Sequence, residues 1–74
     1  ANHSDAKSVA KAVGRADYVA GRVGQPLDPD VTNIAKQISG NPQGQQGILQ
    51  NHGLTEEQFV NKARSMLADY KPQL

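Results

Sequence analysis

The chain has 74 residues, eight Lys or Arg against seven Asp or Glu, and no Cys. This length predicts one domain with a thin core, too small for a deep active-site cleft, and the lack of Cys excludes disulfides and thiolate metal sites. The formal net charge of +1 favours no class of partner until the charges are placed. No apolar run approaches the ~18 residues of a membrane-spanning helix. We therefore expect residues 1–74 to form a single soluble helical domain without membrane contact, with flexible ends at 1–3 and 71–74.

A long amphipathic helix is predicted from Ser4, a good N-cap residue, to Val23, where Gly24 and Pro26 stop it. One side of this helix carries small apolar residues: Ala6, Val9, Ala10, Ala12, Val13, Ala16, Val19, Ala20 and Val23. The opposite side carries four cations and one aromatic residue, here called the basic stripe: Lys7, Lys11, Arg15, Tyr18 and Arg22. The basic stripe is the candidate partner-binding site, since such a face can meet phosphates or an acidic protein surface. The competing interpretation is a solvated outer face.

A second, shorter helix is predicted from Pro29 to about Gly40. Asp28 is a favourable N-cap, and Pro at the first helical position costs little because its missing N–H would be unpaired there. Apolar residues then recur with the helical period: Val31, Ile34, Ala35 and Ile38.

The segment from Gln43 to His52 predicts a weaker third helix, with Asn41 as its cap. Gly44 and Gly47 each cost about 1 kcal/mol relative to Ala in a helix interior. We therefore expect an irregular helix that ends at Gly53.

The last predicted helix, which runs to Tyr70, has the strongest start signal. Thr55 is a good N-cap, and Gln58 stands three residues later, as in a capping box. The apolar residues of this helix fall on one side: Phe59, Val60, Ala63, Met66, Leu67 and Tyr70. The residues expected at the centre of the core come from all the predicted helices: Val13, Ile34, Ile38, Leu49, Phe59, Met66 and Leu67.

No residue pattern indicates enzymatic chemistry. Nucleophilic catalysis needs an activated side chain beside a base, and the two His and four Ser residues are spread over separate elements. Gly40–Gly44 lacks the Lys of a phosphate-binding loop. Ala1-Asn2-His3 would suit Cu(II) or Ni(II) at a free amino terminus, but a His reaches the third place of an arbitrary terminus by chance. We predict no catalytic, cofactor or metal site.

The sequence therefore predicts an all-α fold, a small orthogonal or up-down bundle of three to four short helices. The predicted function is a non-enzymatic protein-protein interaction module, an accessory or excised domain of a larger protein or assembly. The alternative is a nucleic-acid-binding helical domain that uses the basic stripe. A helix-turn-helix is disfavoured because residues 43–52 contain no Lys or Arg for phosphates. Self-association is a further candidate, since a second copy could cover the small-residue edge of the first helix.

Overall fold

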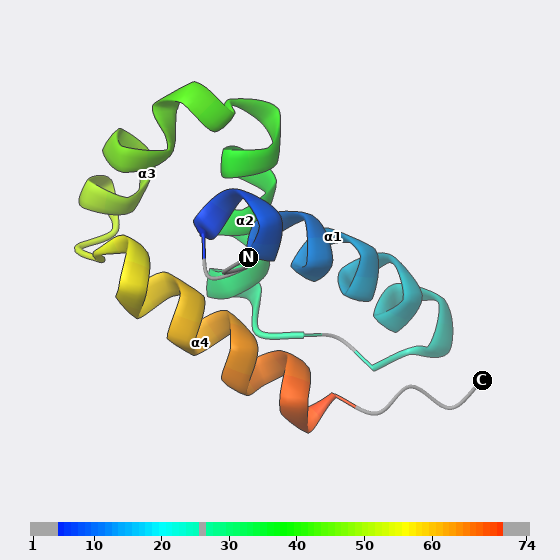
Figure 1. Ribbon diagram of the computed structural model, residues 1–74. Coiled ribbons are helices and arrows are strands. Elements are labelled where there is room, and N and C mark those ends of the chain that lie inside the picture. Colours follow the sequence, from blue (N-terminus) through cyan, green and yellow to red (C-terminus); the bar gives the residue numbers. More distant parts are fainter. Residues whose placement is uncertain (1–4, 26, 71–74) are drawn as a thin grey trace.

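The computed structural model describes residues 5–25 and 27–70, which form four α-helices and one 3-10 turn (Figure 1). The elements follow in the order α1 (Ala6–Val23), α2 (Pro29–Gly40), η1 (Pro42–Gly44), α3 (Gln45–Asn51) and α4 (Glu56–Asp69). No strand occurs within the described ranges, so the predicted all-α bundle is confirmed. The ends predicted to be flexible, 1–3 and 71–74, lie outside the described residues.

Local chemistry sets both ends of α1. Asp5 is the N-cap, and its carboxylate accepts a hydrogen bond of 2.7 Å from the backbone N–H of Ser8. The prediction of Ser4 as the cap is wrong by one residue; Ser4 itself lies outside the described residues. Asp and Ser are equally good N-caps, so neighbouring candidates are not separated by residue type. At the other end, Gly24 stops the helix as predicted, and it does so in the left-handed conformation, with φ of 74°.

Helices α2 and α4 begin where their sequence signals predict. The Asp28 carboxylate accepts a hydrogen bond of 2.9 Å from the backbone N–H of Asp30, and Pro29 occupies the first helical position. The capping box of α4 is complete. The backbone N–H of Gln58 donates to Thr55 Oγ1 at 3.1 Å, and the backbone N–H of Thr55 donates to Gln58 Oε1 at 2.9 Å.

The third predicted helix is irregular, and Asn41 occupies the N-cap position of its first part without a side-chain cap. The segment divides into η1 and the seven-residue α3, and the Asn41 side chain makes no capping hydrogen bond. That side chain instead packs against Gly44, where any Cβ would collide with the Asn41 amide. Gly53, with φ of 69°, then turns the chain toward α4.

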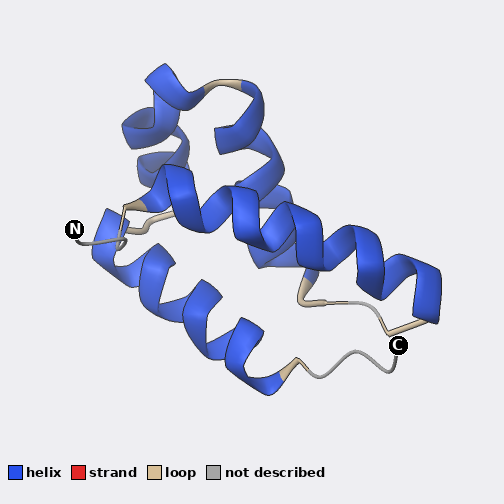
Figure 2. Cartoon of the chain, turned by 45° about the vertical axis from the view of Figure 1, so that its right-hand side comes forward, coloured by secondary structure: helices blue, strands red, loops and turns tan. Residues whose placement is uncertain are grey.

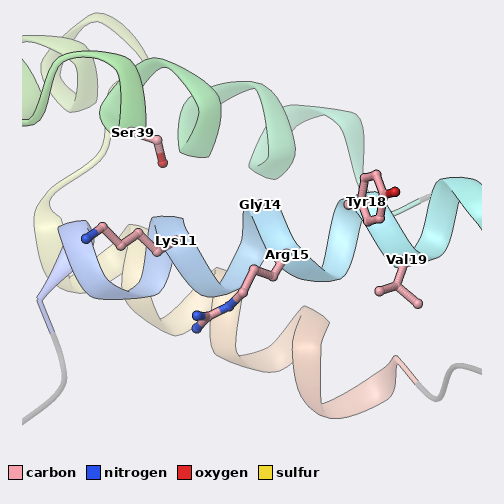
Figure 3. A pocket seen from close by; sticks show the side chains of 6 residues that line it. All are labelled: Lys11, Gly14, Arg15, Tyr18, Val19 and Ser39. Carbon is pink, nitrogen blue, oxygen red and sulfur yellow. The ribbon is translucent and has the colours of Figure 1, made fainter.

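Helix α1 packs against both α2 and α4. It starts beside the N-terminus of α4, and the two helices separate toward their C-terminal ends (Figure 2). Helices α1 and α2 run side by side in opposite directions (Figure 3), and an ion pair of 3.5 Å between Asp17 Oδ2 and Lys36 Nζ joins them. This arrangement leaves one long side of α1 uncovered by the other helices.

The core corresponds in part to the one predicted. Five of the expected central residues are buried: Val13, Ile34, Ile38, Leu49 and Phe59. Met66 and Leu67 are only partly buried, which corrects the prediction. Both lie in the half of α4 that diverges from α1, so no neighbouring helix covers them fully. The rest of the buried cluster is made of small or branched side chains: Ala6, Val9, Ala10, Val31, Ala35, Val60 and Ala63.

Candidate protein-binding face on helix α1

The basic stripe lies on the uncovered side of α1. All five of its side chains are exposed: Lys7, Lys11, Arg15, Tyr18 and Arg22. They extend from the first turn of the helix to the last, a span of about 22 Å at 1.5 Å per residue. The buried residues of α1 lie on its other sides, where α2 and α4 pack. The helix therefore divides cleanly into a core-facing part and a charged outer part.

The cations of the basic stripe form no ion pair with a described residue. Two acids belong to α1 or its N-cap position, and both are engaged elsewhere. Asp17 pairs with Lys36 of α2, and Asp5 caps the helix. A third, Glu56 of α4, accepts a hydrogen bond from the backbone N–H of Ala6 at the start of α1. The outer side of α1 is therefore a band of positive charge with no acid within it, which raises the local concentration of anionic groups.

The side chains of Tyr18 and Arg22 contact each other on the basic stripe. Arg22 Nη1 donates a hydrogen bond of 3.2 Å to Tyr18 Oη, and the Arg22 guanidinium carbon lies 5.8 Å from the centre of the Tyr18 ring. This distance is within the range of cation–π attraction. Tyr18 is nevertheless 66% exposed. A large ring held in place by a neighbour offers contact area at a reduced cost in side-chain entropy.

Next to Tyr18, the surface of α1 is hollowed into a shallow depression of about 650 Å³ (Figure 3). Gly14 is one of its lining residues; it is exposed, and a Cβ at this position would meet no atom within 4 Å. The surface of the depression consists mainly of carbon, because the stems of the long cations contribute to it. Six residues line it: Lys11, Gly14, Arg15, Tyr18, Val19 and Ser39.

The depression brings together residues that the sequence prediction did not associate. Lys11, Arg15 and Tyr18 of the basic stripe line it, whereas Lys7 and Arg22 do not. Ser39 comes from the end of α2, and only the antiparallel packing of α2 on α1 places it there (Figure 3). For Gly14 there was a signal in the sequence, because a glycine in a helix interior lowers helix stability and calls for a reason.

A smaller hollow of about 250 Å³ lies where α3 meets α4. Its lining contains no Lys or Arg: Gln46, Leu49, Gln50, Leu54, Thr55 and Glu56. The Glu56 carboxylate is already engaged, since it accepts hydrogen bonds from the Ala6 N–H at 3.0 Å and from Gln45 Nε2 at 2.8 Å. Helix α3 therefore offers amides but no cation to a nucleic-acid backbone.

Over residues 5–25 and 27–70, no three His, Asp or Glu side chains are grouped so that they could hold a metal ion. No helix in the same ranges has the length and apolarity needed to cross a membrane. Comparison with protein-family models, curated proteins and solved structures gives no significant match to this chain. A functional proposal must therefore rest on the geometry and charge of α1.

Proposed function

We propose that the protein is a non-enzymatic binding module that docks its basic stripe on an acidic surface of a partner protein. The supporting observation is that four cations and a held tyrosine share one exposed helix face with no acid within it. Charge complementarity would steer such an encounter and fix its register. Tyr and Arg are also the residue types that contribute most at the centre of protein interfaces.

A protein partner is favoured over a nucleic acid by the surroundings of the cations. The depression between Lys11, Arg15 and Tyr18 is lined mainly by carbon, which suits an apolar side chain rather than a phosphate. The net charge of +1 gives the chain no broad positive field. Nucleic-acid binding through the same stripe is the alternative, and it would be largely independent of sequence, because phosphate contacts carry no base information.

Affinity capture from the cells that express the protein tests the proposal. Three baits are compared: wild type, Lys11→Glu/Arg15→Glu, and the control Lys62→Glu/Arg64→Glu. Lys62 and Arg64 are exposed on α4, so the control has the same net charge with an intact stripe. A partner identified by mass spectrometry should be captured by wild type and by the control but not by the Lys11→Glu/Arg15→Glu bait. The purified partner should then bind the stripe variant at least about tenfold more weakly.

Two results would contradict this proposal. The first is a partner that the Lys11→Glu/Arg15→Glu bait captures as well as wild type does, while circular dichroism shows that this bait is folded. The interface would then lie elsewhere. Binding of mixed-sequence duplex DNA at physiological salt, lost in the stripe variant, would instead favour the nucleic-acid alternative. In that case the logarithm of the binding constant should fall linearly with the logarithm of the salt concentration.

A further inference from the structure

We infer that the depression over Gly14 receives one apolar side chain of an acidic amphipathic helix that lies along α1. This inference rests on the proposed function and names the class of partner. The depression combines a carbon-lined surface with cations along its rim, Lys11 and Arg15, and with the ring of Tyr18. A ligand that fits both features carries carboxylates and an apolar anchor on one face.

The spacing of the cations suits a helical ligand. Lys7, Lys11 and Arg15 follow one another every four residues, so they are about 6 Å apart along the axis of α1. Carboxylates at every fourth residue of a partner helix repeat at the same interval. Three ion pairs can therefore form between two helices that lie side by side.

An extended peptide fits this surface less well. Extended ligands commonly bind by adding a strand to a sheet edge, where backbone hydrogen bonds supply much of the affinity. The described residues contain no strand, so they offer no such edge. Along the middle of α1, where the depression lies, the backbone groups are paired within the helix, so a ligand there meets side chains only. A helical ligand has its backbone hydrogen bonds within itself, so it can bind α1 through side-chain contacts alone.

Gly14 creates the space for the anchor. On the helix surface its position has Lys11 three residues before it and Tyr18 four residues after it, and both face the same side. The fold gives no other reason for glycine there: the φ of Gly14 is not positive, and a Cβ would meet nothing within 4 Å. A side chain at this position would fill the depression without disturbing the core.

Synthetic helical peptides as long as α1 test the inference. The first peptide carries Glu at every fourth position on one face and a single Leu beside the middle Glu. A second peptide has Ala in place of that Leu, and a third has the composition of the first with its Glu residues spread around the helix. Binding is measured by fluorescence anisotropy at physiological salt to four proteins: wild type, Gly14→Leu, Gly21→Leu and Lys11→Glu/Arg15→Glu. Gly21 is also exposed on α1 with no atom near its Cβ position, but it does not line the depression.

We expect wild type to bind the Leu peptide about tenfold more tightly than the Ala peptide, because half-burial of a leucine gives about that factor. Gly14→Leu should abolish this difference, and Gly21→Leu should keep it. Equal binding of the Leu and Ala peptides, with both weakened in Lys11→Glu/Arg15→Glu, would overturn the anchor while leaving the proposed function intact. Binding of the three peptides that does not depend on Lys11 and Arg15, or no binding at all, would overturn this inference, whereas the proposed function is decided separately by the capture experiment above.

Discussion

The carboxylate of Glu56 accepts a hydrogen bond of 3.0 Å from the backbone N–H of Ala6, 50 residues earlier in the chain. Ala6 is the first residue of α1, where backbone N–H groups have no acceptor within the helix. The same carboxylate oxygen accepts a hydrogen bond of 2.8 Å from Gln45, the first residue of α3. Since Glu56 itself begins α4, one side chain connects the starts of three helices.

Replacing Glu56 by Ala should therefore lower the free energy of unfolding by about 1 kcal/mol. A hydrogen bond to a charged group is worth more than this when it is buried, but Glu56 is exposed and water partly replaces the lost contact. Glu57→Ala is the matched control, because Glu57 is also exposed in the first turn of α4 and forms no hydrogen bond or ion pair with α1 or α3 among the described residues. Urea unfolding followed by circular dichroism measures the free energy of unfolding of both variants. Equal losses in the two variants would show that only the helix dipole of α4 is involved.

A glycine within α1 and the glycine that ends this helix should respond in opposite ways to alanine. Gly14 is helical and exposed with nothing near its Cβ position, so Gly14→Ala should raise the free energy of unfolding by about 1 kcal/mol. Gly24 has φ of 74°, a conformation that costs an L-residue about 1–2 kcal/mol, so Gly24→Ala should lower it by a similar amount. Thermal unfolding of both variants tests these two predictions. A Gly24→Ala protein as stable as wild type would mean that the end of α1 rearranges freely.

The helix boundaries of this chain could be predicted because capping is local. Asp28, Thr55 and Gln58 act on backbone groups no more than three residues away, and the structure shows all of these bonds. The outer side of α1 was equally accessible to prediction, since its five polar positions repeat with the period of the helix. Local signals still fail where neighbouring residues are equally good caps, as at the start of α1, where Asp5 and not Ser4 is the N-cap.

The contacts that depend on how helices meet could not be predicted. Periodicity shows which side of α4 is apolar but not how far α1 extends along it, so Met66 and Leu67 were assigned too much burial. The place of Ser39 in the lining of the depression depends on the direction of α2, and the bond from Ala6 to Glu56 spans most of the chain. Such relationships come from tertiary packing, on which local sequence signals have little bearing.

The ion pair between Asp17 and Lys36 should contribute little to stability. The two atoms are 3.5 Å apart, and the Lys36 side chain is 68% exposed, so solvent and salt screen the attraction. Lys36→Ala should change the free energy of unfolding by about 0.5 kcal/mol or less. The measurement is urea unfolding of wild type and variant in low and high salt. A large loss at low salt that disappears at high salt would show that this pair does fix the packing of α2 on α1.

Phe59 and Met66 lie on the same apolar side of α4, but their truncation should have very different effects. Phe59 is fully buried, and Phe59→Ala should cost about 3–5 kcal/mol, which approaches the whole stability of a domain this small. Met66 is only partly buried, in the half of the helix that diverges from α1, so Met66→Ala should cost about 1 kcal/mol. Thermal unfolding followed by circular dichroism, with both variants at equal concentration, measures the difference. If Met66→Ala were as damaging as Phe59→Ala, the C-terminal half of α4 would have to be covered in solution by a further surface, such as a second copy of the chain.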